Sequence, residues 1–183
     1  MNRVHTLVGG AVLLGVLAIA AVDGVKSAQR WDTMAPAAPG TTLERFAVHR
    51  LDGSTFGHAD LLGKVSVVTF WASWCGPCQG ELADLDELDD DYAGREDVQF
   101  VAVNWEGAGY TPEQRRHITA AHVQKIGLGI PVAFDDGEMV RALRVGGVPH
   151  TLVVDPQGVV RFVHPGRVRA GTIADDIADL TRQ

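Results

Sequence analysis

The sequence predicts an α/β domain in which a central mixed sheet is flanked by helices. Two uncharged apolar runs of strand length, residues 65–71 and 98–104, are each followed by a segment with helix-start signals. Downstream, two more strand-like segments surround the turn D-P-Q-G and precede a last helical segment. Alternating strands and helices predict parallel strands with right-handed crossovers, and the downstream hairpin adds antiparallel strands.

The segment before the first long strand predicts an N-terminal β-hairpin. Residues 43–49 alternate like a strand, Asp52-Gly53 is a turn dipeptide, and Thr55-Phe56 begins a short returning strand. The chain then leads through Leu62-Gly63-Lys64 into the apolar strand 65–71. We therefore expect the domain to carry a hairpin ahead of its main sheet.

The helices follow from the spacing of leucines and from capping signals. Leu82, Leu85 and Leu88 recur at helical spacing among acidic residues, which predicts an amphipathic helix over residues 77–92 with its acidic run on a solvated face. Thr111-Pro112 predicts the start of a second helix that runs to about residue 125. The remaining expected elements are a strand at 131–134, a short helix at 137–143, strands at 151–154 and 159–164, and a closing helix at 172–180.

The composition is that of one globular domain and argues against nucleic acid as a partner. The chain has 183 residues and 46% hydrophobic content, enough to form a core without a disulfide scaffold. Its net charge of -7 lacks the basic balance with which proteins bind a phosphate backbone.

Residues 1–25 form a separate segment, either a membrane anchor or a signal peptide. An uncharged stretch at 7–22 lies between Arg3 and Asp23, and its length falls between that of a signal-peptide core and that of a spanning helix. Residues 18–20 read A-I-A, which would serve as a cleavage site. Under either reading Arg3 keeps the amino terminus cytoplasmic, so the later residues lie outside, where disulfides persist. The Ala- and Pro-rich residues 26–42 predict a linker, and residues 43–183 the folded domain.

The sequence W-C-G-P-C at residues 74–78 contains both cysteines of the chain. Two thiols at this spacing in the first turn of a helix can close on each other reversibly. Cys75 faces the unpaired N–H groups and the positive end of the helix dipole, which favour the thiolate, so we expect it to attack a substrate disulfide. Cys78 lies one turn deeper and is expected to resolve the mixed disulfide.

The residues around the cysteines favour redox chemistry over the other uses of this spacing. Gly76 allows a partner backbone to approach, and Pro77 starts a helix without needing an N–H donor. A structural metal site needs four ligands, and the sequence has no second cysteine pair, so we expect no metal. Gln79 in place of histidine excludes covalent haem attachment. An inert structural disulfide stays open as an alternative, although so short a loop gains little stability from closure.

Two motifs together resemble the thioredoxin superfamily: F-W-A-S-W-C-G-P-C at residues 70–78 and G-G-V-P-H-T-L-V-V-D-P-Q-G at residues 146–158. With the preceding hairpin and N-terminal segment, residues 43–180 are similar to the TlpA/ResA/CcmG type of membrane-anchored thiol-disulfide oxidoreductase. The resemblance implies a thioredoxin-like fold. It also favours an uncleaved anchor in the cytoplasmic membrane, with the domain on the periplasmic or extracytoplasmic side; a cleaved, periplasmic or secreted protein is the alternative.

The resemblance also implies where clients bind. Pro149 is expected to be cis and to lie against the disulfide, so that the main chain of Val148 can pair with a client peptide. Trp74, beside Cys75, is expected to shape the surface that the client meets, together with Gly76 and Pro77.

Two departures from the family pattern concern proton transfer and the cover of the site. Thr69 stands where thioredoxin has a buried carboxylate, and threonine cannot exchange a proton near neutral pH. We expect Glu106 to accept the proton of Cys78 instead, with an exposed loop glutamate as the alternative. His150 follows the proline and could tune the thiolate by its charge or cover the site.

The resulting hypothesis is an envelope enzyme that exchanges disulfides with protein clients and needs no cofactor beyond its own Cys75–Cys78 disulfide. By resemblance to the cytochrome c maturation branch we expect it to reduce clients such as apocytochrome c, to be recharged by a membrane electron donor, and to contact the lipid bilayer through residues 1–25. The alternatives are a disulfide-forming oxidase of the same fold and, from another class, a protein that delivers Cu(I) bound by both cysteines.

Overall fold

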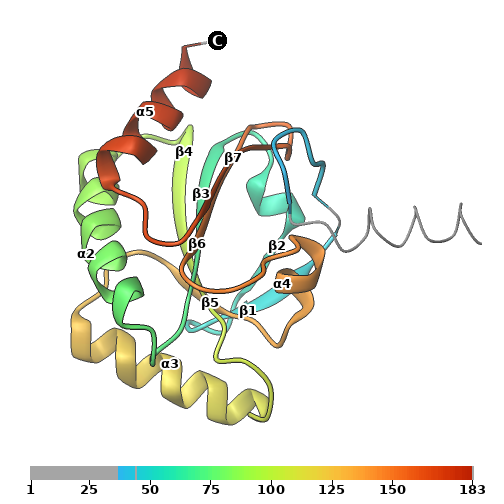
Figure 1. Ribbon diagram of the computed structural model, residues 1–183, viewed down its shortest axis with the longest axis vertical. Coiled ribbons are helices and arrows are strands. Elements are labelled where there is room, and N and C mark those ends of the chain that lie inside the picture. Colours follow the sequence, from blue (N-terminus) through green and yellow to red (C-terminus); the bar gives the residue numbers. More distant parts are fainter. Residues whose placement is uncertain (1–36, 44, 183) are drawn as a thin grey trace, which may run out of the picture. The chain divides into compact units, whose positions relative to one another are not determined.

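The computed structural model describes residues 37–43 and 45–182, which form a seven-stranded mixed sheet in the order β2-β1-β5-β4-β3-β6-β7 (Figure 1). The membrane anchor or signal segment expected at residues 1–25, and residues 26–36 of the expected linker, lie outside the described residues. The elements, in chain order, are β1 Ala47–Arg50, β2 Thr55–Gly57, the 3-10 helix η1 His58–Leu61, β3 Val65–Trp71, α2 Gly76–Asp91, β4 Val98–Asn104, α3 Pro112–Ile126, β5 Val132–Phe134, α4 Glu138–Ala142, β6 His150–Val154, β7 Val160–Pro165 and α5 Ala170–Thr181.

The centre of the sheet follows from the two apolar runs. β3 and β4 pair in parallel from Val65↔Val98 to Trp71↔Asn104, and β4 pairs in parallel with β5. β6 pairs antiparallel with β3, and β7 antiparallel with β6. All seven residues of β3 are buried, as expected for a strand covered on both faces. The predicted mixed sheet flanked by helices is therefore confirmed.

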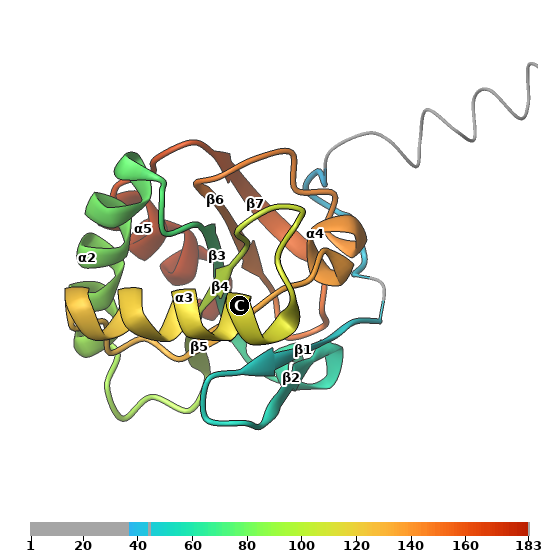
Figure 2. The ribbon, with the colours of Figure 1, turned by 90° about the horizontal axis from the view of Figure 1, so that it is seen from below.

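Helices cover both faces of this sheet. α2, α3 and α5 lie on one face, and α4 and η1 lie on the other (Figures 1 and 2). Each face has its own hydrophobic cluster, because alternate residues of β3 point to opposite sides: Val67 and Trp71 to the α2 side, Val68 and Phe70 to the α4 side. The cluster on the α2 side also contains both cysteines.

The N-terminal hairpin joins the main sheet through β5. β1 pairs antiparallel with β2 and with β5, so the hairpin becomes the edge of the sheet beyond β5. β1 is shorter than the expected 43–49, because the chain first runs beside the other edge of the sheet, where Thr42 forms a bridge with Val159. Hydrogen bonds from Gly40 N to Val160 O (2.8 Å) and from Val160 N to Thr41 O (2.9 Å) tie this segment to β7.

The sequence analysis missed one element, the 3-10 helix η1, which packs Leu61 completely into the core. Within the described part of the chain, no helix combines the length and hydrophobicity that crossing a membrane requires.

Candidate active site

The two cysteines lie at the start of α2, as the sequence predicted, and form a disulfide. Cys75 is the N-cap of the helix, and its Sγ accepts a hydrogen bond from the Cys78 amide at 3.3 Å. Pro77 lies in the first turn, where its missing N–H has no cost. The Cys75–Cys78 Cα atoms are 5.3 Å apart. A sulfur at an N-cap is held among N–H donors at the positive end of the helix dipole, which favours its thiolate once the disulfide is reduced.

Both sulfurs are sheltered, Cys78 more than Cys75. The exposed fraction is 4% for Cys75 and 1% for Cys78. Trp74, directly before them, is 63% exposed, although its indole Nε1 donates a hydrogen bond of 3.4 Å to the Glu106 carbonyl oxygen. The indole ring is therefore an oriented apolar surface next to Cys75 in the chain, and its role in client contact stays a prediction.

The Glu106 carboxylate holds the loop that carries Trp74 and Cys75. It is 5% exposed and accepts hydrogen bonds from Ser73 N (2.8 Å), Ser73 Oγ (2.9 Å) and Asn104 Nδ2 (2.7 Å). Asn104 is anchored in turn by the Thr119 hydroxyl of α3 at 2.9 Å. Glu106 is thus a buried loop residue, not the exposed glutamate of the alternative. Its role as proton acceptor for Cys78 stays a prediction, since its hydrogen bonds go to the loop before the cysteines.

A second carboxylate, Glu81, lies on the buried face of α2 and was missed by the sequence analysis. Its exposed fraction is 1%. Oε1 accepts hydrogen bonds from the Thr151 hydroxyl (2.6 Å) and the Thr69 hydroxyl (3.1 Å), and Oε2 accepts one from Val168 N (2.9 Å). The expectation that the acidic run of this helix is wholly solvated is therefore wrong for Glu81. The Glu81 carboxylate thus lies within hydrogen-bond distance of the Thr69 side chain, but Glu81 belongs to helix α2, whereas Thr69 belongs to strand β3.

The sequence did hold a signal for Glu81. It follows Cys78 by three residues and precedes Leu85 by four, so it belongs to the same helix face as these two buried residues. Residues at this spacing are neighbours, with Cβ atoms about 5–6 Å apart. Glu81 therefore lies on the same buried face of α2 as Cys78, one turn further along the helix.

The segment Val148-Pro149 precedes β6, and its peptide bond is cis, as expected. Val148 packs against both hydrophobic clusters, including the one that contains the cysteines. His150 opens β6, pairs with Phe70 of β3 and is buried. Burial, with a smaller contribution from the charge of His164, lowers the pKa of His150 below its ordinary value. Burial therefore disfavours a charged imidazole at this position, and the expected roles of His150 at the site stay predictions.

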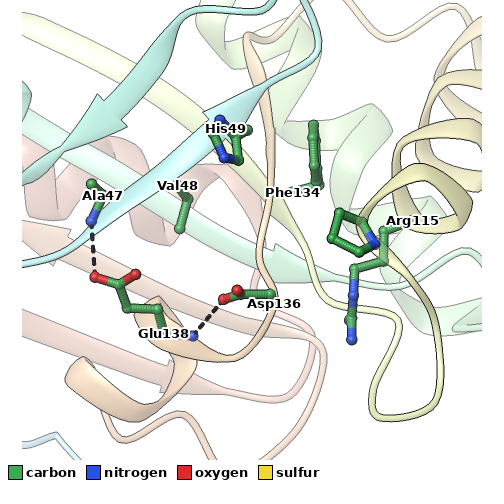
Figure 3. Close-up of a pocket in the computed structure, with 8 residues that line it drawn as sticks. Ala47, Val48, His49, Arg115, Phe134, Asp136 and Glu138 are labelled. Atoms are coloured by element: carbon green, nitrogen blue, oxygen red, sulfur yellow. Dashed lines mark hydrogen bonds between the residues drawn. The ribbon is translucent and has the colours of Figure 1, made fainter.

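Another pocket lies between β1, β5, the start of α3 and α4, and contains neither cysteine (Figure 3). Its polar lining consists of His49, Arg115, Asp136 and Glu138. Glu138 is already bonded to the Ala47 amide, and Asp136 to the Glu138 amide. The nucleophile of the chain is elsewhere, at the start of α2.

Comparisons with known proteins agree with this geometry. Residues 38–163 match the model of the AhpC/TSA family. Thiol-disulfide oxidoreductase ResA of Oceanobacillus iheyensis is 26% identical over 173 residues, which cover 94% of this chain and 85% of the relative. Thioredoxin-like protein YneN of Bacillus subtilis is 31% identical over 127 residues, which cover 69% of this chain and 71% of the relative. Among solved structures, a putative thiol:disulfide interchange protein DsbE from Chlorobium tepidum superposes with a TM-score of 0.66 at 27% identity, covering 79% of this chain and 97% of that one.

The sequence matches and the structural match therefore indicate the same kind of protein. The chain belongs to the AhpC/TSA family and has the thioredoxin-like fold of its ResA- and DsbE-type thiol-disulfide oxidoreductases.

Proposed function

We propose that the protein reduces disulfides of protein clients outside the cytoplasm by thiol-disulfide exchange through Cys75. The observation that carries this proposal is the position of the Cys75 sulfur: it caps α2, it is bonded to the Cys78 amide, and Cys78 lies buried behind it. This arrangement supplies an activated nucleophile and a resolving thiol within one helical turn.

The exchange runs in two steps and balances in electrons. In the reduced enzyme the Cys75 thiolate attacks one sulfur of the client disulfide, forms a mixed disulfide and releases the other client sulfur as a thiolate. The Cys78 thiolate then attacks Cys75 Sγ and releases the client's second thiolate, which takes up a proton. The client gains two electrons, and the enzyme is left with the Cys75–Cys78 disulfide, the state that the structure describes.

Cys78 must lose its proton before the second step, and Glu81 is the better placed of the two candidate acceptors. Glu81 shares the buried face of α2 with Cys78, one helical turn further along, whereas the Glu106 carboxylate bonds to Ser73 in the loop before the cysteines. A carboxylate beside a buried thiol can take the proton during the attack, which is general base catalysis. We therefore assign the proton transfer to Glu81 and the orientation of the Trp74-Cys75 loop to Glu106.

Client binding uses the surface between Trp74 and the cis-proline segment. Trp74 provides an exposed aromatic face, and Val148 offers its backbone beside Pro149 in the manner of strand addition. Gly76 and Pro77 are exposed at the helix start, so a client backbone can approach Cys75 there.

The reductive direction and the client follow from resemblance. By similarity to the cytochrome c maturation branch, the clients include apocytochromes whose haem-binding cysteines must stay reduced. Each turnover oxidises the enzyme, so a membrane donor of two electrons must restore the dithiol. We place the enzyme at the cytoplasmic membrane, anchored through residues 1–25, with the domain on the outer side.

Two measurements test this function. Cys78→Ala should accumulate client mixed disulfides on Cys75 in intact cells, whereas Cys75→Ala should trap none; equal trapping by both would refute the assigned roles. The reduction potential should lie nearer the value of thioredoxin, about −270 mV, than the value of about −120 mV of strong disulfide-forming oxidants. A value near the latter would reverse the proposed direction.

A further inference from the structure

The pocket of Figure 3 is small and separate from the dithiol. Its volume is about 160 Å³, below the roughly 300–1,000 Å³ of pockets that enclose drug-sized ligands. Its lining comes from β1, the first turns of α3, the end of β5 and the start of α4. Neither cysteine takes part, so a ligand in this pocket would bind apart from the sulfur chemistry.

Arg115, in the wall of this pocket, has a buried charge that the domain does not neutralise. The residue is 7% exposed, and its Nη1 donates hydrogen bonds to the carbonyl oxygens of Gly107 (2.8 Å) and Asp135 (3.4 Å). Its Nε has no hydrogen-bond partner, and no carboxylate of the described residues lies within ion-pair distance of the guanidinium. A buried cation without a counter-charge costs free energy, which an anionic group from outside the domain would lower.

Two carboxylates lie across the pocket from Arg115. Figure 3 shows Asp136 and Glu138 on the side of α4, opposite Arg115 of α3. Glu138 Oε1 accepts from Ala47 N at 3.3 Å, and Asp136 Oδ1 accepts from Glu138 N at 3.2 Å. The second oxygen of each carboxylate has no partner among the described residues. Both side chains are exposed, so a cationic group can reach them from solvent.

The surface between the two charged sides of the pocket is apolar. Val48 is 4% exposed and Phe134 8% exposed, and both line the pocket. The ring of His49 lies tilted beside that of Phe134, with 5.9 Å between the ring centroids. A short aliphatic group between the charged sides would gain free energy by leaving water.

We infer that this pocket binds a small α-amino acid as its zwitterion. The carboxylate pairs with the guanidinium of Arg115, whose planar N–H donors match a carboxylate, and the ammonium group pairs with Asp136 and Glu138. A short aliphatic side chain of the ligand rests on Val48 and Phe134. The inference goes beyond the proposed disulfide exchange and does not rest on it.

The charges of the pocket disfavour simpler ligands. An inorganic anion would match Arg115 but would be repelled by Asp136 and Glu138, and a metal cation would match the two carboxylates but would be repelled by the guanidinium. A ligand that has both charges a few bonds apart meets an opposite charge on each side. The small volume favours an amino acid of about the size of alanine.

The test titrates the full-length protein with L-alanine by calorimetry and compares it with acetate and ethylammonium, each of which has only one of the two charges. We expect alanine to bind at least about tenfold more tightly than either, the size of one well-placed interaction. Nuclear magnetic resonance locates the site: the amide resonances of Ala47 and Glu138, which bond to the two carboxylates, should shift when alanine binds.

Four variants identify the groups that bind. Glu138→Gln and Asp136→Asn should each weaken alanine binding by about tenfold and should not weaken acetate binding. Arg115→Gln should weaken both, and its denaturation midpoint is measured because it also loses its bonds to main-chain carbonyls. Arg116→Gln is the matched control: it is the next residue of α3, it is exposed and it does not line the pocket, so alanine should bind as it does to the wild type.

The two carboxylate variants decide the question even if Arg115→Gln does not fold. Acetate or ethylammonium that binds as tightly as alanine overturns the inference. Alanine affinities of Glu138→Gln and Asp136→Asn that equal the wild-type value also overturn it, as does a wild type that binds no alanine. Each of these results leaves the exchange reaction at Cys75 intact, because the pocket contains neither cysteine.

Discussion

Replacing Glu81 with glutamine tests the assignment of the proton acceptor. The amide has the shape of the carboxylate but cannot take up a proton near neutral pH. Glu81 is bonded to two hydroxyls, those of Thr69 and Thr151, and to the Val168 amide. The amide oxygen of glutamine can still accept from Val168 N–H, and the two hydroxyls can rotate to accept from its NH₂ group.

The structure predicts a small effect on stability and a large effect on rate. Each of the three hydrogen bonds to the charged carboxylate becomes a bond to a neutral amide, at a cost of about 1 kcal/mol per bond. Removal of a buried charge offsets part of this cost. We expect the free energy of unfolding to change by no more than about 2 kcal/mol. Loss of general base catalysis should slow the attack of Cys78 on the mixed disulfide by about 100-fold at pH 7.

The assay loads Cys75 with a chromophoric thiol as a mixed disulfide and follows its release by stopped-flow absorbance between pH 5 and 10. The slowing in Glu81→Gln should fade above about pH 8.5, the ordinary pKa of a cysteine thiol, because Cys78 then ionises without help. Asp135→Asn is the matched control: Asp135 is also a buried carboxylate, but it caps α4, so the release rate should equal that of the wild type.

Glu106→Gln completes the comparison, because it discriminates between the two carboxylates. If Glu106→Gln shows the pH-dependent slowing and Glu81→Gln does not, the proton passes through Glu106 and the present assignment is refuted. If neither variant slows release, no carboxylate acts as the base, and Cys78 loses its proton to solvent.

Three further changes test the contacts around the site. Glu106→Ala leaves the Ser73 amide and the Asn104 side chain without their acceptor, so the free energy of unfolding should fall by about 2–4 kcal/mol in a denaturant titration; a loss below about 0.5 kcal/mol would show that this carboxylate does not hold the loop. Because burial lowers the pKa of His150 from 6.5, the unfolded chain binds the proton first; this contribution to stability is present above pH 6.5 and is lost as the pH falls below it. His150→Phe should therefore flatten the acid side of the stability profile, and unchanged slopes would contradict the burial argument. Asp86 accepts two backbone amides, both at 2.8 Å, on the path into β5; Asp86→Ala should cost about 1–3 kcal/mol, against less than about 1 kcal/mol for Asp84→Ala, which removes an exposed ion pair.

The elements that the sequence predicted well are those whose cause is local. β3 and β4 have the bounds read from their apolar runs, and α3 starts at Pro112 behind its Thr111 cap. The pairing of Cys75 with Cys78 follows in the same way, since a helical turn alone brings the two sulfurs together. The cis bond at Pro149 was predicted from a motif and is present.

The predictions that failed depend on contacts between distant segments. Glu81 looked like one of many acidic residues on an exposed helix face, and only the packing of α2 on β3 and β6 brings Thr69 and Thr151 to its carboxylate. β1 is shorter than expected because the preceding residues pair with β7, a partner far along the chain. Local spacing carries no information about which distant strand supplies a hydrogen bond.

The sequence by itself therefore determined the reactive dithiol and the order of strands and helices, because helix dipoles, capping and hydrophobic periodicity act over a few residues. Only the tertiary structure decided which distant groups bond to Glu81, what Glu106 holds, and that His150 is buried. Those properties arise when segments that are far apart in the chain exclude water from one another, and burial then sets which polar groups keep a partner.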